Sequence, residues 1–271
     1  MKALIFTTGI ESLLSKTLSS LWGKGEYKGD LLVLEYEPYS DAFRDVLLAH
    51  NSIIVKVSKV YNYMCVDRVV HYQEYISKHW EEYDVLMHMD GNDIEICSPI
   101  EQLLEMSRDN ICCVKEQYQG VLNVKNSRWI GYMGFPDYNE VWSAMKNEYM
   151  VNAGMYVGSS SLIAEFLDMA RMYLNHRSDW GVDQVLLNAF VYYYRAKSAK
   201  FLGFEWNYIV CPIERTELFY YEKLIDNFGL EIKIAHRVGN TNINGIKKSW
   251  DDTGQKAVRG TFLFPHPDRL P

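Results

Sequence analysis

The chain has 271 residues, of which 48% are hydrophobic and 23% are charged, an ordinary composition for a globular protein with a substantial core. The formal net charge of −7 argues against a nucleic-acid-binding protein, because such proteins usually carry a basic face. No run approaches the ~18 apolar residues that a membrane-spanning helix needs, which leaves only peripheral membrane contact open. The five cysteines show no zinc-like spacing and favour free thiols in a reducing cytoplasm.

Short apolar runs alternate with helical patterns along the first third of the chain. Strands are predicted at Ala3–Thr7, Leu31–Glu35, Ile53–Val57 and Asp84–Met89, and helices at Glu11–Trp22, Tyr39–His50 and Val66–Trp80. Such alternation is typical of an α/β fold, in which helices cover both faces of a parallel sheet. Right-handed crossovers bring the carboxyl ends of the strands to one edge, where ligands bind in open α/β sheets.

The rest of the chain is less regular. Strands are predicted at Ile111–Val114, Phe201–Phe204 and Ile232–Ala235, and helices at Ser160–Asn175 and Val182–Tyr194. The loop-like stretch Gly120–Asp137 is a candidate lid or acceptor-binding segment. Because no repeat or linker interrupts the chain, we expect one domain over residues 1–251, followed by an irregular, proline-containing tail over residues 252–271.

Oxygen-bearing side chains gather directly after the fourth predicted strand, at Asp90, Asn92 and Asp93. Hard divalent cations prefer oxygen ligands and readily share phosphate oxygens with a protein. Residues two apart on an extended chain face the same way, so Asp90 and Asn92 could reach one ion, whereas Asp93 would need a turn. The same residues also suit a plain turn without a ligand.

Two further segments carry polar side chains next to predicted elements. Asn152, in Asn152-Ala153-Gly154, could bind sugar hydroxyls through both its donor and its acceptor, or it could cap a turn. Asp183 and Gln184 open a predicted helix, where they could contact a reacting sugar or could serve the helix N-terminus.

A fourth segment contains His236, Gly239 and Lys248. A histidine at a strand end can ligate a metal, although a lone histidine is more often a satisfied polar residue. Gly239 would allow close approach of a phosphate to the backbone, and Lys248 supplies a compact positive charge.

In order and spacing, the four segments resemble the GT-A-fold glycosyltransferases, especially the family-8-like group related to glycogenin and bacterial lipopolysaccharide galactosyltransferases. The Asp-x-Asp motif of that group matches Asp90-Gly91-Asn92, with Asn in place of the second Asp. Its Asn-Ala-Gly and Asp-Gln motifs match Asn152-Ala153-Gly154 and Asp183-Gln184. Its late His-x-x-Gly and Lys-Pro-Trp motifs match His236, Gly239 and Lys248-Ser249-Trp250, with Ser for Pro.

The resemblance implies a single GT-A domain with a mixed, mainly parallel sheet, which transfers a sugar from a nucleotide-diphosphate sugar, such as a UDP-sugar, to a glycan or lipid-linked saccharide. It implies Mn²⁺ or Mg²⁺ as cofactor and these roles: metal ligands Asp90, Asn92 or Asp93, and His236; donor and phosphate contacts Phe6, Thr7, Thr8, Arg68, Gly239 and Lys248; catalytic residues Asn152, Asp183 and Gln184. Whether the anomeric configuration is retained or inverted stays open.

Two other functions remain as alternatives. A sugar-nucleotide pyrophosphorylase would carry a Gly-rich, cationic loop after the first strand, whereas residues 7–11 contain one glycine and no cation. A non-catalytic nucleotide-sugar- or carbohydrate-binding protein of the same fold is compatible with Asn92, because asparagine brings less charge to a metal than aspartate.

Overall fold

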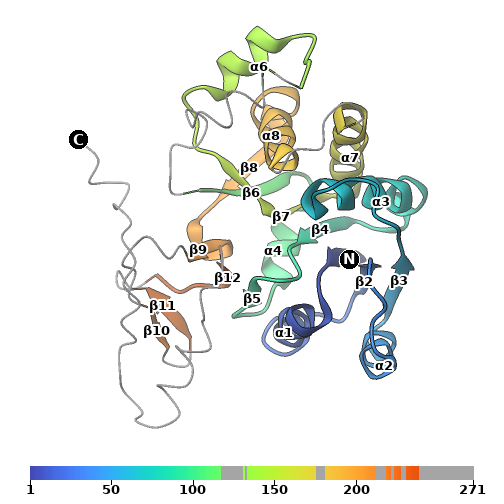
Figure 1. The fold of residues 1–271 in the computed structure, drawn as a ribbon. Coiled ribbons are helices and arrows are strands. Elements are labelled where there is room, and N and C mark those ends of the chain that lie inside the picture. The colour runs from blue at the N-terminus through green and yellow to red at the C-terminus, as the bar shows by residue number, and fades with distance from the viewer. Residues whose placement is uncertain are drawn as a thin grey trace.

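The computed structural model describes residues 1–116, 131, 133–174, 181–210, 218–220, 223–226 and 230–237 (Figure 1). Gly239, Lys248, the boundary at residue 251, the tail, and most of the predicted loop at residues 120–137 lie outside the described residues. No helix in the described part of the chain is long and apolar enough to cross a membrane.

A seven-stranded sheet forms the centre of the molecule, with strand order β3-β2-β1-β4-β7-β6-β8. Its strands are β1 (Ala3–Thr8), β2 (Asp30–Glu35), β3 (Ser52–Lys56), β4 (Val85–Met89), β6 (Ile111–Lys115), β7 (Val151–Ser159) and β8 (Ala199–Leu202). All neighbouring strands are parallel except those beside β7, which runs antiparallel to both β4 and β6. The predicted α/β class with a mixed, mainly parallel sheet is therefore confirmed.

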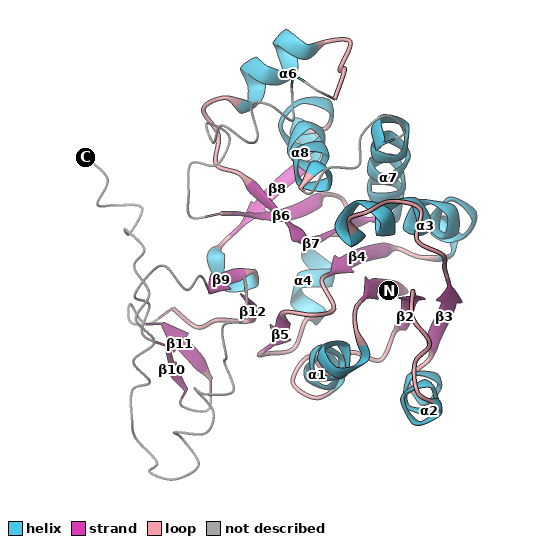
Figure 2. Cartoon of the chain, viewed as in Figure 1, coloured by secondary structure: helices cyan, strands magenta, loops and turns pink. Residues whose placement is uncertain are grey.

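Helices cover both faces of this sheet (Figure 2). The longer ones are α1 (Glu11–Trp22), α2 (Asp41–Ala49), α3 (Met64–His79), α7 (Ser160–Leu174) and α8 (Val182–Ala189), which continues as the π-helix Phe190–Tyr194. The shorter ones are α4 (Glu101–Met106), α6 (Tyr138–Met145) and the 3₁₀ turns Trp80–Glu82, Ala196–Ser198 and Phe204–Trp206.

Side chains that point alternately to the two faces of the sheet form two apolar cores, one on each face. On β1, Leu4 and Phe6 face the core formed with α3, α7 and α8, whereas Ile5 faces the core formed with α1, α2 and α4. Because successive strand side chains point to opposite faces, a continuous apolar run is required where both faces are covered. The nine-residue strand β7 is buried from Val151 to Gly158, with Asn152 as the polar exception in its apolar run.

Capping determines where α2 begins. The Ser40 hydroxyl accepts a hydrogen bond from the Phe43 amide (3.2 Å) and donates one to the Glu11 carboxylate of α1 (2.7 Å). These bonds satisfy an amide at the helix start that has no partner within the helix. They also tie α2 to α1 near the carboxyl end of β1.

A smaller sheet lies beside the carboxyl edge of the central one. It has the order β5-β12-β9 and consists of β5 (Ile94–Ile96), β12 (Ile234–Arg237) and β9 (Tyr208–Val210), while β10 (Leu218–Tyr220) and β11 (Leu224–Asp226) form a separate antiparallel pair. In β12, His236 pairs with Ile94 of β5 in antiparallel register. This pairing brings a late segment of the chain next to the acidic turn that follows β4.

Several of these elements differ from the sequence-based expectations. The strand expected at Phe201–Phe204 lies at Ala199–Leu202, and residues Phe204–Trp206 form a 3₁₀ turn instead. The strand expected at Ile232–Ala235 lies at Ile234–Arg237. The short strands β5 and β9 were not predicted, because three residues carry too little periodicity to be recognised.

Candidate functional site

The acidic turn after β4 is fixed by bonds to its two neighbouring strands. The Thr7 hydroxyl of β1 donates to the Met89 carbonyl (2.6 Å), and the Asp90 amide donates to the Gly154 carbonyl of β7 (2.8 Å). Asp90 therefore lies at the carboxyl edge of the sheet between a parallel and an antiparallel strand. This edge is where ligands bind in open α/β folds.

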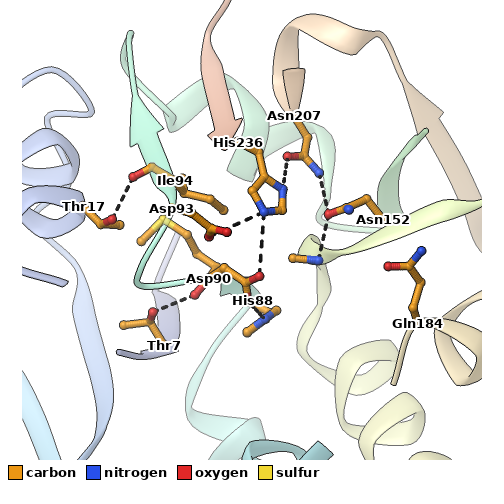
Figure 3. Close-up of polar contacts among 12 residues, drawn as sticks. Thr7, Thr17, His88, Asp90, Asp93, Ile94, Asn152, Gln184, Asn207 and His236 are labelled. Atoms are coloured by element: carbon orange, nitrogen blue, oxygen red, sulfur yellow. Dashed lines mark hydrogen bonds and ion pairs between the residues drawn. The ribbon is translucent and has the colours of Figure 1, made fainter. Parts of the chain in front are cut away.

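Asp90, Asp93 and His236 converge at this edge (Figure 3). We refer to these three residues together with Arg68 as the carboxylate side. One ligand atom from each of Asp90, Asp93 and His236 lies within 4.8 Å of the others. The imidazole Nε2 of His236 is 3.5 Å from Asp93 Oδ1 and 3.8 Å from Asp90 Oδ2. The motifs thus lie close together although they are far apart in the sequence.

The cluster has the chemistry for a divalent cation. Asp93 Oδ1 is buried and makes no hydrogen bond among the described residues. A Cβ at Gly154 would lie 2.2 Å from His236 Cε1 and 2.8 Å from Asp90 Oδ2, so only glycine allows both side chains to come this close to β7. Two carboxylates and one imidazole suit Mn²⁺ or Mg²⁺ better than a thiol-preferring ion.

The two candidates for the second oxygen ligand from this turn, Asn92 and Asp93, point to different places. Asn92 Oδ1 accepts a hydrogen bond from the Ile10 amide (2.9 Å), which ties the acidic turn to the loop after β1. A side chain at Gly9 would lie 2.5 Å from this oxygen. The structure therefore places Asp93, and not Asn92, beside Asp90 and His236.

Arg68 joins the carboxylate side to Asp183. Its guanidinium forms ion pairs with Asp90 Oδ1 and with Asp183 Oδ2, the second at 3.4 Å. Burial raises the pKa of Asp183 to about 6, and Arg68 opposes part of this rise. Burial acts in the same direction on Asp90, but Arg68 and the neighbouring histidines outweigh it and hold the pKa of that carboxyl below its usual range. Both groups are thus ionised near neutral pH.

Histidines on two strands contact the acidic turn in different ways. Burial, with a further contribution from Arg68, lowers the pKa of His88 to about 4, so this ring is neutral and donates from Nε2 to Asp90 Oδ1 (3.3 Å). Burial opposes protonation of His236, but Asp93 and Asp90 outweigh it and raise the pKa of that ring. His88 thereby orients Asp90, whereas His236 turns its Nε2 toward both Asp90 and Asp93.

Four polar side chains form a second group, which we call the amide side: Glu116 directly after β6, Asn152 on β7, Gln184 on α8, and Asn207 directly before β9. Glu116 Oε1 accepts hydrogen bonds from Asn152 Nδ2 (2.9 Å) and Gln184 Nε2 (3.1 Å). Burial raises the pKa of Glu116, although both amides oppose the rise. Asn207 joins Asn152 to His236, so the two sides are in direct contact.

The residues predicted at the end of β1 have mainly structural contacts. The ring of Phe6 is fully buried against Tyr72, with ring centroids 4.8 Å apart, so the structure assigns it to the core and corrects its expected place in a base pocket. Thr7 and Thr8 are also buried, and the Thr8 hydroxyl donates to the Leu34 carbonyl (2.9 Å). A ligand at this edge would meet the loop that follows, at Gly9 and Ile10.

Glu116, Asn207 and His88 belong to the site but were missed from the sequence. Glu116 could have been found, because it directly follows a predicted strand. Both β4 and β6 are antiparallel to β7, which lies between them, so β4 and β6 run in the same direction and end at the same edge of the sheet. Asn207 follows the 3₁₀ turn Phe204–Trp206 and shows no local signal. His88 has the position of an ordinary core residue within β4.

Comparison with solved structures identifies the fold. The galactosyltransferase LgtC in complex with donor and acceptor sugar analogues superposes with a TM-score of 0.55 and 14% identity, over 88% of this chain and 87% of that one. An active-site mutant of LgtC also gives a TM-score of 0.55, with 12% identity and 88% of each chain covered. The GT-A fold predicted from the motifs is therefore confirmed. No protein-family model and no curated protein matches the sequence.

Proposed function

We propose that this protein transfers a sugar from a nucleotide-diphosphate sugar, such as a UDP-sugar, to a hydroxyl group of a glycan or lipid-linked saccharide. The observation that carries the proposal is the convergence of Asp90, Asp93 and His236 at the carboxyl edge of a GT-A fold, directly beside Asp183 and the amide side. A fold alone hosts many functions, so the proposal depends on this arrangement of side chains.

Asp90, Asp93 and His236 would hold a Mn²⁺ or Mg²⁺ ion. When bound to the donor diphosphate, such an ion supplies Lewis-acid stabilisation of the leaving nucleoside diphosphate. The fit is supported by the close approach of His236 and Asp90 that Gly154 permits, and by the buried Asp93 oxygen that makes no hydrogen bond among the described residues. In this proposal Asn92 is not a ligand, because its oxygen is bonded to the Ile10 amide.

The remaining roles follow from charge and hydrogen-bonding capacity. Asp183 would stabilise positive charge that develops at the anomeric carbon, since a buried carboxylate acts strongly in a water-poor site. Asn152 carries a second amide N–H besides the one used on Glu116, and this would donate to a sugar hydroxyl. The Gln184 amide donates to Glu116 and to the Met150 sulfur, so Gln184 would bind a sugar hydroxyl through its amide oxygen. Phosphate contacts of Gly239 and Lys248 remain predictions for residues outside the described part of the chain.

A donor-cleavage assay tests the proposal. The protein is incubated with UDP-, GDP- and TDP-sugars, with and without Mn²⁺, and both nucleotide and sugar products are measured. We expect metal-dependent release of a nucleoside diphosphate from one donor class, with the Asp90→Ala variant as the control for contaminating activity.

The other outcomes assign the protein differently. Release of a sugar 1-phosphate in the presence of pyrophosphate would identify a pyrophosphorylase. Metal-dependent donor binding without turnover, even with a panel of saccharide acceptors, would indicate a binding protein of the same fold. In a thermal-shift measurement, a specific donor raises the melting temperature by mass action, so binding can be detected without catalysis.

A further inference from the structure

The hydrogen bonds of Asn152 have a defined direction. Its Oδ1 accepts from the Gly154 backbone amide (2.9 Å), which can only donate. Its Nδ2 donates to the Glu116 carboxylate (2.9 Å), which accepts when ionised. Two partners of opposite character therefore fix the orientation of this amide, so its oxygen and nitrogen cannot be exchanged without losing both bonds.

Asn207 continues this direction toward the carboxylate side (Figure 3). The Asn152 oxygen accepts from Asn207 Nδ2 (3.3 Å), which orients the Asn207 oxygen toward His236 Nδ1 at 3.1 Å. Asn207 is only 1% exposed, and both polar atoms of its side chain are used in these two bonds. An amide oxygen can only accept, so Nδ1 of His236 must carry the proton.

The consequence falls on the other nitrogen of the ring. A neutral imidazole that carries its proton on Nδ1 has a lone pair on Nε2. Nε2 is the atom that faces Asp90 Oδ2 and Asp93 Oδ1, at 3.8 and 3.5 Å. The opposite tautomer would turn an N–H toward the space between these carboxylates and could not ligate a cation there.

We propose that Asn207 is a positioning residue that fixes the His236 tautomer and thereby prepares Nε2 as a metal ligand. The inference rests on the metal site of the proposed function. It goes beyond that function because the Gly154 amide orients Asn152, Asn152 orients Asn207, and Asn207 orients His236. This chain of hydrogen bonds would therefore help to set the metal affinity. Partners that orient a ligating histidine typically contribute about 10- to 100-fold in metal affinity.

Nuclear magnetic resonance of the metal-free wild-type protein tests the tautomer directly. Histidine side chains are labelled with ¹⁵N, spectra are recorded at alkaline pH where the ring is neutral, and the His236 signals are assigned by their loss in His236→Gln. We expect a protonated Nδ1 and an unprotonated Nε2. A protonated Nε2 in the neutral ring would overturn the proposal.

Titration with Mn²⁺ alone, followed by electron paramagnetic resonance, tests the consequence. Asn207→Ala should weaken binding about 10- to 100-fold. Asn207→Asp keeps an acceptor for His236 but removes the donor to Asn152, so it should bind Mn²⁺ at least about tenfold more tightly than the alanine variant. A purely structural role would give no such rescue.

Asn188→Ala is the matched control. Asn188 is also buried and also braces β7, through bonds to the Val151 amide (2.8 Å) and carbonyl (2.9 Å), but its described hydrogen bonds do not reach His236. It should lose stability without changing Mn²⁺ affinity. Wild-type affinity in a folded Asn207→Ala variant would overturn the inference. If the wild type bound no Mn²⁺, the proposed metal site would fail, while the tautomer measurement would still decide the role of Asn207.

Discussion

The two sides of the site keep buried polar groups in place by different means. The carboxylate side balances two aspartates with Arg68 and His236, so its arrangement depends on net charge. The amide side uses Asn152, Gln184 and Asn207 around the single carboxylate of Glu116, so its arrangement depends on the direction of each hydrogen bond. Charge changes should therefore disrupt the first side, and only loss of donors or acceptors should disrupt the second.

The largest effect is expected for Asp90→Ala, which removes one proposed metal ligand and leaves Asp183 as the ion-pair partner of Arg68 among the described residues. Metal-assisted stabilisation amounts to several kcal/mol, and each 1.4 kcal/mol is a factor of ten, so turnover should fall by about 1000-fold. Nucleoside diphosphate release and Mn²⁺-dependent nucleotide binding are the measurements. A folded variant with undiminished turnover would refute the metal role.

Arg68→Met tests the charge balance through stability. The change leaves Asp90 and Asp183 without their shared cation, and removal of one partner from a buried ion pair typically costs about 3–5 kcal/mol in the free energy of unfolding. Urea denaturation without metal measures this cost. Arg195→Met is the control, because its pair with Glu165 is largely exposed and should contribute less than about 1 kcal/mol.

Asp183→Asn tests the role of the Asp183 charge, which lies between the carboxylate side and the amide side. The amide keeps the shape but loses the negative charge, so it should lower turnover by about 100-fold through weaker transition-state stabilisation. Donor affinity, measured by titration calorimetry, should change much less. An equal loss in both quantities would assign Asp183 a binding or structural role.

The pH dependence of stability should separate wild type from the same variant. Burial raises the pKa of Asp183 from 3.8 to about 6, with Arg68 opposing part of the rise, so the folded protein holds this proton more tightly than the unfolded chain does. The stabilisation that the bound proton gives the folded state is complete below pH 3.8, the pKa in the unfolded chain. It is lost as the pH rises through about 6, the pKa in the folded protein. Relative to Asp183→Asn, the free energy of unfolding should fall by on the order of 2–3 kcal/mol in this window. Chemical denaturation from pH 4 to 7 checks this expectation, and parallel curves would contradict it.

The smallest effect is expected at Asn92. Asn92→Ala removes the bond to the Ile10 amide and should cost about 1 kcal/mol of stability while leaving Mn²⁺ affinity unchanged. Asp93→Asn should weaken Mn²⁺ binding although it preserves the shape of the turn. If Asn92→Ala weakened Mn²⁺ binding and Asp93→Asn did not, the result would assign Asn92, and not Asp93, to the proposed metal site.

Much of the fold could be predicted from the sequence, because alternating apolar runs and helical patterns report which face of each element is buried. The elements from β1 to β4 and the helices α7 and α8 follow this rule. The small sheet that brings His236 to the acidic turn could not be predicted, since its three- and four-residue strands are specified by pairing between distant segments.

The site could be predicted only in part for the same reason. The motifs identified Asp90, His236, Asn152 and Asp183, which the structure brings to one edge. The choice between Asn92 and Asp93 depends on the turn after β4, and Phe6 lies in the core because of the register of β1. Asn207 gains its place through tertiary contacts alone, so no local pattern marks it.

The junction between β7 and α7 has a consequence for how the site keeps its alignment. No loop separates these elements, because β7 ends at Ser159 and α7 begins at Ser160. A strand joined directly to a packed helix cannot shift its register by one residue unless the helix moves as well. Such a shift would turn every side chain of the strand to the other face of the sheet. Packing of α7 therefore holds Asn152 and Gly154 of β7 in register. One residue inserted between Ser159 and Ser160 should disturb the candidate site, although that site lies at the opposite end of β7.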